Sequence, residues 1–194
     1  MVDPTESLQA AGLREGDHLT AIATPLKVAA TRGAIALWCC GGNQVVTWGD
    51  RNSGGDSSGV KDQLKGVQQV HATSRAFAAI LADGSVVPWG NPDCGGDSSG
   101  VKDQLKGVQQ VHATDSAFAA ILADGSVVTW GGRDFGGDSS GVKDQLKGVQ
   151  QVEVTKTAFV AILADGSVVT WGSWQGNPFC SDGSSIAAQV AYLY

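Results

Sequence analysis

The chain has 194 residues, 27 of them glycine, and a formal net charge of −6. A hydrophobic fraction of 42% is enough for a packed core, which excludes a disordered chain and allows one domain with at most a short appendage. The 13 basic residues are spread along the chain, so we expect neither nucleic acid nor an acidic lipid surface as a partner. No apolar run approaches the roughly 20 residues that span a bilayer, and the acidic start of the chain is not expected to be a secretory signal.

Four cysteines, at positions 39, 40, 94 and 180, show neither a disulfide framework nor a metal-binding spacing. We therefore expect free thiols in a reducing intracellular compartment, either the cytoplasm or a plastid. Cys39 and Cys40 replace Leu81 and Ala82 of a later copy and are expected to fill core space, whereas Cys94 lies in a predicted loop and is expected to be exposed.

An internal repeat of 41 residues dominates the sequence. The dipeptide Trp-Gly recurs at this spacing, and the segment GGDSSGVKDQLKGVQQV begins unchanged at Gly54, Gly95 and Gly136. The first copy is less regular. We predict four repeats over residues 26–172, preceded by an N-terminal extension over 1–25 and followed by a partial repeat or tail over 173–194. The repeat tryptophans are Trp48, Trp89, Trp130 and Trp171.

Each unit is expected to contain three short strands, at residues 67–73, 77–81 and 86–89 in the second copy. Asp83-Gly84 predicts a two-residue hairpin turn in which the aspartate itself has a positive φ, and Asp124 and Asp165 are its equivalents. The glycine-rich remainder is predicted to connect the units. A tryptophan at a fixed place in every unit is expected to pack between neighbouring sheets.

The unit V-x-A-T-x-x-A-F-A-A-I-L-A-D-G-S-V-V-T-W-G, followed by a Gly-Gly-Asp-Ser loop, resembles the RCC1-like repeat family over about residues 26–172. Its short period is similar to three-stranded RCC1-like blades, and to HERC-like arrays common in algae. The resemblance implies an all-β fold, either a closed RCC1-like β-propeller or an open propeller arc of about four three-stranded blades, used for protein binding. Two features depart from the family. Its usual Gly and His before the apolar strand are replaced here by Ala72 and Thr73, and its rings usually have seven blades.

The N-terminal segment 13–22 permits two interpretations. It resembles the closing strand of a ubiquitin-like fold, and it also suits an extra strand that pairs with a blade edge or with residues 187–194. We prefer the second interpretation, because the sequence contains no other part of a ubiquitin-like domain.

Three motifs partly match known catalytic or ligand-binding patterns, and each can also be interpreted as a turn. Ser57, Ser98 and Ser139 each lie in a G-x-S-x-G pattern, but a catalytic serine is not expected in three equal loop copies. Residues 54–61 only partly match a phosphate-binding loop, and Asp56 would repel phosphate. The loop aspartates at 56, 97 and 138 could bind a cation, although side-chain turns explain them better. We predict no catalytic residue, no cofactor and no metal site.

Differences between the copies concentrate at positions 71–75 and 91–94 and their equivalents, as expected of a fixed frame that presents a changing surface. The candidate interface residues are Trp174, Phe135, Phe179, Arg75, His71 and His112. The predicted function is a non-enzymatic protein-interaction scaffold, an accessory subunit of a multi-subunit complex. The algal resemblance points to a photosynthetic membrane complex as its host. The alternatives are a nucleotide-exchange regulator of a small GTPase and a substrate-binding module linked to a ubiquitin ligase.

Overall fold

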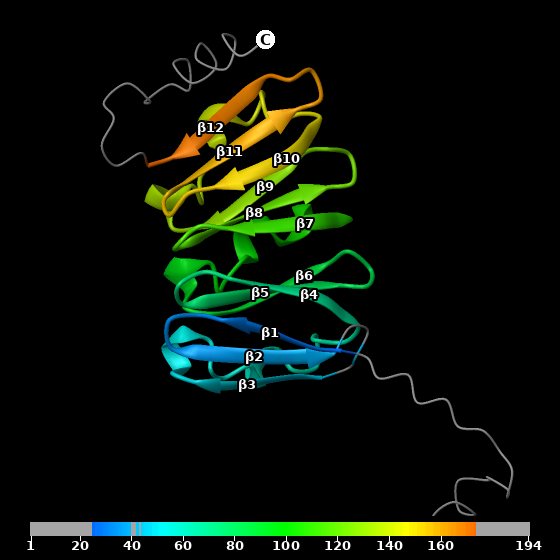
Figure 1. Cartoon of the computed structure of the whole chain (residues 1–194), viewed down its shortest axis with the longest axis vertical. Coiled ribbons are helices and arrows are strands. Elements are labelled where there is room, and N and C mark those ends of the chain that lie inside the picture. Colours follow the sequence, from blue (N-terminus) through cyan, green and yellow to red (C-terminus); the bar gives the residue numbers. More distant parts are fainter. Residues whose placement is uncertain (1–24, 40–41, 43, 174–194) are drawn as a thin grey trace, which may run out of the picture.

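The computed structural model describes residues 25–39, 42 and 44–173, which form four three-stranded antiparallel sheets stacked one after another along the molecule (Figure 1). We call the sheets blades 1 to 4 in chain order. The first strand of each blade lies beside the first strand of the next, and we call these four strands the inner strands. The strands are β1 (Leu26–Ala30), β2 (Ala34–Cys39), β3 (Val45–Gly49), β4 (Val67–Ala72), β5 (Ala76–Leu81), β6 (Val86–Gly90), β7 (Val108–Ala113), β8 (Ala117–Leu122), β9 (Val127–Gly131), β10 (Val149–Val154), β11 (Ala158–Leu163) and β12 (Val168–Gly172).

The linkers between blades contain short 3-10 turns and no α-helix among the described residues. The first turn after each of blades 1 to 3 ends at a glycine with left-handed backbone, such as Gly54 with a φ of 88°. This conformation excludes most other residues at the first glycine of the repeated Gly-Gly pair. The second glycine is required by close packing, since a β-carbon on Gly55 would clash with the Gly49 carbonyl oxygen. The turns are η1 (Arg51–Ser53), η2 (Ser58–Val60), η3 (Pro92–Cys94), η4 (Ser99–Gln104), η5 (Arg133–Phe135) and η6 (Ser140–Val142).

Alternation along the strands gives every blade two different apolar faces. In blades 2 to 4 the aromatic face carries the repeat tryptophan and the phenylalanine paired with it across the sheet, Trp130 and Phe118 in blade 3. Their rings stack with centroids 5.1 Å apart, and the Trp130 indole Nε1 donates a hydrogen bond to the Gly95 carbonyl over 3.0 Å. The opposite small-residue face carries alanines and an isoleucine, as at Ala117 and Ile121.

Blade 1 departs from this pattern on both faces. Trp48 on its aromatic face is paired with Ile35 instead of a phenylalanine, and Trp38 stands in place of the isoleucine on its small-residue face.

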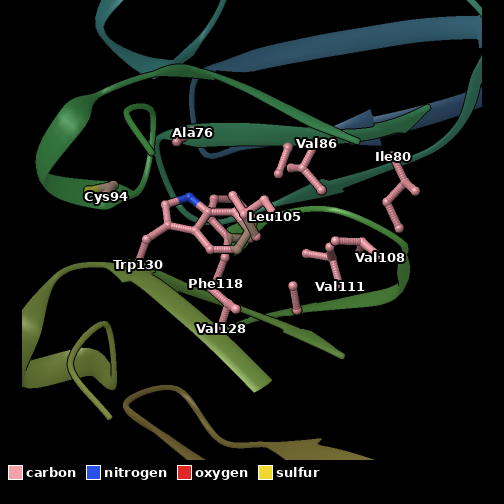
Figure 2. Close-up of a cluster of buried hydrophobic side chains, with 12 residues drawn as sticks. Ala76, Ile80, Val86, Cys94, Leu105, Val108, Val111, Phe118, Val128 and Trp130 are labelled. Carbon is pink, nitrogen blue, oxygen red and sulfur yellow. The ribbon is translucent and has the colours of Figure 1, made fainter. Parts of the chain in front are cut away.

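Blades pack with the aromatic face of one against the small-residue face of the blade before it. Figure 2 shows this between blades 2 and 3, where Phe118 and Trp130 lie against the sheet that carries Ala76 and Ile80. A leucine from the linker, Leu105, completes the cluster. The interface between blades 3 and 4 is built in the same way, and that between blades 1 and 2 differs by Trp38, which stands where the others have an isoleucine. Three similar apolar layers thus hold the four blades together.

Among the described residues, no earlier blade lies against the aromatic face of blade 1, and this corrects one sequence prediction. Trp89, Trp130 and Trp171 are only 4–6% exposed, as expected of residues between sheets, but Trp48 is 47% exposed. The expectation that all four tryptophans pack between blades is therefore wrong for Trp48. Its sheet forms normally, but no described residues cover that face.

The Asp-Gly hairpins also differ from the prediction. In blade 2 the loop has three residues, 82–84, closed by a hydrogen bond from the Gly84 N–H to the Leu81 carbonyl, and only Gly84 has a positive φ (76°). This is a turn followed by a left-handed glycine, a common three-residue hairpin loop. Asp83 instead accepts hydrogen bonds from the Ser85 hydroxyl and N–H, which lower the pKa of its carboxyl group. Asp124 and Asp165 make the same contacts with Ser126 and Ser167.

Candidate functional site: the variable rim

The two variable stretches of each unit meet at one end of the blade. In blade 2, the Thr73 hydroxyl donates to the Cys94 carbonyl over 2.9 Å, and the Asn91 N–H donates to the Arg75 carbonyl over 3.0 Å. Thr31 and Thr114 repeat the first contact with the carbonyls of Ser53 and Phe135. We call the resulting surface the variable rim. It comprises the loops at 31–33, 73–75, 114–116 and 155–157 and the linker starts at 50–53, 91–94 and 132–135.

Backbone hydrogen bonds join the loops of the variable rim from blade to blade. The N–H groups of Arg32, Ser74 and Asp115 each donate over 2.9 Å to the corresponding carbonyl of the next blade, the last of them that of Lys156. The Arg32 guanidinium also reaches past Ser74 to the Asp115 carboxylate, with 2.9 Å between Nη2 and Oδ2. Loops of all four blades thus line a shallow depression of about 690 Å³ with a fixed backbone and varied side chains.

The inner strands carry a second polar row beside this depression. His71 and His112 occupy equivalent places on neighbouring blades, and both line a hollow of about 600 Å³ together with Gln69 and Gln110. The two histidines lie on the neighbouring strands β4 and β7, and His112 contributes to the lowered pKa of His71. Burial is the larger cause, and the pKa of His71 falls to about 4. Burial also lowers the pKa of His112, partly opposed by the charge of Glu153.

The lowered pKa of His71 makes the stability of the fold depend on pH. Because the unfolded chain binds this proton with the ordinary pKa of 6.5, acidification from pH 6.5 towards 4 favours unfolding. We expect the free energy of unfolding, measured by urea denaturation, to fall across this window in the natural chain. It should fall less in His71→Gln, which keeps a polar side chain but cannot titrate. Equal losses in both proteins would show that other groups cause the acid sensitivity.

The structure places the predicted interface residues unevenly. Arg75 is exposed on the variable rim, and His71 and His112 are partly buried on the inner strands beside it. Phe135 lies on the rim but is half-buried against the core between blades 3 and 4. Trp174 and Phe179 lie outside the described residues.

Cys94 is not exposed, which corrects another expectation. Its side chain is 9% exposed and packs in the core between blades 2 and 3, where its thiol lies 3.6 Å from the Ser116 hydroxyl (Figure 2). The Thr73 hydroxyl donates a hydrogen bond to the Cys94 carbonyl and so ties this loop to the blade. Cys39 is half-buried, and Cys40 and Cys180 are outside the described residues.

The serine and aspartate motifs of the linkers form turns. Asp56, Asp97 and Asp138 each accept a hydrogen bond from the backbone N–H two residues later, as the side-chain turn interpretation predicts. The hydroxyls of Ser57 and Ser139 accept from those of Thr47 and Thr129, and neither is paired with a histidine. In the described part of the chain no group of three or more His, Cys, Asp or Glu side chains is placed to bind a metal ion.

Sequence reasoning found the variable positions but missed the residues that bring them together. Thr31, Thr73, Thr114 and Thr155 do not vary, so they read as part of the frame. The hydroxyl groups of the first three donate hydrogen bonds that join a rim loop to a linker carbonyl 21 or 22 residues later. Four invariant threonines beside variable residues could have indicated a structural role. Their partners could not be identified, because every residue has a backbone carbonyl and the sequence does not mark the one that is used.

None of the helical segments among the described residues has the length and apolar character of a membrane-crossing helix. No protein-family model matches the sequence, and no relative was found among curated proteins. The chain is similar in structure to human WBSCR16, with 18% identity, a TM-score of 0.52, and coverage of 80% of this chain and 50% of that one. It is also similar to Prp20p from Saccharomyces cerevisiae, with 17% identity, a TM-score of 0.53, and coverage of 75% and 43%.

A structure of yeast RCC1 (Prp20) with Kap60 gives a similar match, at 18% identity and a TM-score of 0.53, over 75% of this chain and 42% of that one. The chain therefore spans half or less of the length of these structures. The likeness rests on the same arrangement of antiparallel strands, since the sequences share few residues. The chain has the RCC1-like repeat fold, in the form of an open propeller arc of which the structure describes four three-stranded blades.

Proposed function

We propose that the chain is a non-enzymatic protein-binding module and that the variable rim is its binding surface. One observation carries this proposal. The strands and linkers repeat almost unchanged, whereas the residues that differ between units gather at one end of the blades through the threonine contacts. A repeated frame with varied loops is an arrangement that many binding proteins use, while a catalytic centre needs one particular set of residues.

The structural likeness adds general support. The Prp20p structure is described with binding to Gsp1p and histones, and yeast RCC1 (Prp20) is seen bound to Kap60. Proteins of similar fold thus bind protein partners. With less than 20% identity, the partners themselves do not transfer to this chain.

The exposed charges of the variable rim have both signs. Arg75 of blade 2 and Asp134 of the following linker are exposed, and neither forms an ion pair with any described residue. We therefore infer a partner whose surface also carries both positive and negative groups. Such charges contribute mainly to specificity and to the rate of association.

A charge swap on the variable rim tests the proposal. Arg75→Glu combined with Asp134→Lys keeps the net charge but inverts two exposed positions. Affinity purification with the full chain identifies a partner, and calorimetry with the purified partner then gives the dissociation constant. We expect this constant to rise at least about tenfold in the variant, because each inverted charge meets a like charge across the interface.

The linkers offer a matched control. Lys102→Glu combined with Asp144→Lys makes the same swap at exposed positions that are identical in three units. This control should leave the dissociation constant within about twofold of the natural value. If both variants weaken binding equally, or neither does, the variable rim is not the binding surface.

Several narrower roles remain predictions of the sequence resemblance. They are an accessory subunit of a larger assembly, including a photosynthetic membrane complex, a nucleotide-exchange regulator of a small GTPase, and a substrate-binding module of a ubiquitin ligase. All of them are protein-binding roles. The identity of the purified partner separates them, and the variable-rim experiment applies to each.

A further inference from the structure

The two ends of the stack present the two halves of one repeated interface. Inside the chain, an aromatic face always packs on a small-residue face. Blades 1 and 4 lie at opposite ends of the stack in Figure 1. Blade 1 packs on blade 2 through its small-residue face, and blade 4 packs on blade 3 through its aromatic face. Among the described residues, the aromatic face of blade 1 and the small-residue face of blade 4 are therefore left outward, and they are of the two kinds that pack together inside the stack, with Ile35 in place of the phenylalanine on blade 1.

The outward face of blade 1 is strongly apolar. Leu26, Val28 and Val46 are 63%, 64% and 55% exposed, beside the exposed Trp48. Val46 and Trp48 lie where Val87 and Trp89 lie in blade 2, and those are 7% and 4% exposed. Large apolar side chains gathered on one surface in this way mark an interaction site more often than a free surface.

The outward face of blade 4 is also less covered than its equivalents. Ile162 and Val168 are half-buried, whereas Ile121 and Val127 at the same places in blade 3 are 5% and 8% exposed. Val160, also half-buried, replaces an alanine of the earlier blades. This face is apolar as well, with Glu153 at its inner edge where blades 2 and 3 have histidines.

Backbone hydrogen bonding is interrupted at the same ends. The backbone hydrogen bonds that join the rim loops run without a gap from Arg32 of blade 1 to Lys156 of blade 4. At the two ends of this series, the Lys156 N–H has no acceptor and the Arg32 carbonyl has no donor among the described residues. At the hairpins, the carbonyls of Gly84 and Gly125 accept from the next blade over 2.9 Å. Gly166 of blade 4 has no such donor among the described residues and open space around its α-carbon.

We propose that the outward face of blade 1 binds the outward face of blade 4 of a second copy of this chain, head to tail. We choose a second copy as the partner because the interfaces inside the stack show what each kind of face packs against and which backbone groups pair across it. Two copies joined at both ends supply eight described blades, within the usual size range of propellers. An interface between unlike faces that closes in this way gives a dimer of defined size rather than an open filament.

The mass of the full chain in solution tests the proposal, with light scattering after gel filtration over a wide range of concentration. We expect a species of twice 19.9 kDa. Val28→Glu on blade 1 and Val160→Glu on blade 4 should each raise the dissociation constant of the dimer at least about tenfold, because a charge would be buried without a partner. Gln104→Glu, at an exposed linker position, adds the same charge and should leave the dimer unchanged.

Mixing the two face variants gives the sharpest result. Val28→Glu keeps a natural blade 4 face and Val160→Glu keeps a natural blade 1 face, so an equal mixture should recover one good interface and form a mixed dimer. Circular dichroism establishes that each variant is folded. A monomer at all concentrations, a dimer indifferent to either substitution, or loss of the dimer in Val28→Glu alone without recovery on mixing would each overturn the proposal. None of these substitutions lies on the variable rim, so the outcome is separate from the partner-binding experiment.

Discussion

Replacing Gly95 with alanine is expected to lower the free energy of unfolding by about 3 kcal/mol. Gly95 has a φ of 93°, and a β-carbon there would lie 2.6 Å from Cδ2 of the Phe118 ring. The backbone strain and the clash add together, because the ring is held by its stack with Trp130 and cannot move away. The Gly95 carbonyl also accepts the hydrogen bond of the Trp130 indole, so a shift of the linker would weaken the interface between blades 2 and 3. Urea denaturation followed by tryptophan fluorescence measures the loss.

Gly100 provides the control for this substitution. It lies five residues later in the same linker, without a positive φ and with no atom within 4 Å of an added β-carbon. Gly100→Ala should be neutral or stabilise the chain by up to about 1 kcal/mol, since alanine restricts the unfolded chain. Similar losses at both glycines would show that the Gly95 conformation is not required.

Truncating Phe118 to alanine is expected to lower the free energy of unfolding by about 3–5 kcal/mol. The side chain is fully buried between blades 2 and 3 and loses both its contacts with the small-residue face and its stack with Trp130. Because each apolar cluster joins only two neighbouring blades, the cavity should separate the stack into two pairs of blades as well as weaken it. Denaturation of the variant by urea should therefore broaden, or show two steps.

Phe135→Ala makes the same chemical change at a half-buried linker position and is the matched control. This ring is less buried than that of Phe118 and lies at the border of a core cluster, so its truncation should cost about half as much as that of Phe118, or less. It should also leave the cooperativity of unfolding unchanged. Equal costs at the two positions would contradict the assignment of Phe118 to the centre of an interface.

The repeat made the architecture predictable. Three short strands, a hairpin at each Asp-Gly pair and a tryptophan between sheets all follow from local patterns, because alternation and turn chemistry act within a few residues. The errors arose where the outcome depends on neighbours outside the unit. Trp48 lies in the same V-V-T-W-G sequence as Trp130 and Trp171, but no earlier blade covers it among the described residues, and its cross-strand partner is Ile35 instead of a phenylalanine.

The candidate site was predictable only in part. The variation at positions 71–75 and 91–94 pointed to a surface, but nothing in the sequence placed these stretches side by side. That depends on the Thr73 hydroxyl reaching a carbonyl 21 residues away, which is the carbonyl of the buried Cys94. Backbone acceptors exist at every residue, so a sequence does not show which one a threonine will meet.

The junctions between blades 2 and 3 and between blades 3 and 4 use nearly the same residues, so these three blades are competent to follow one another in any order. Blade 1 differs, with Trp38 in place of an isoleucine at its junction with blade 2. Removing or adding one whole unit of 41 residues would join surfaces that already match, with no new contact to be selected. Slippage between the nearly identical coding segments of such a gene would thus yield folded products of different lengths. The rim loops would then be reshuffled as complete sets, which offers this architecture a route to new binding specificities through recombination rather than through successive point mutations.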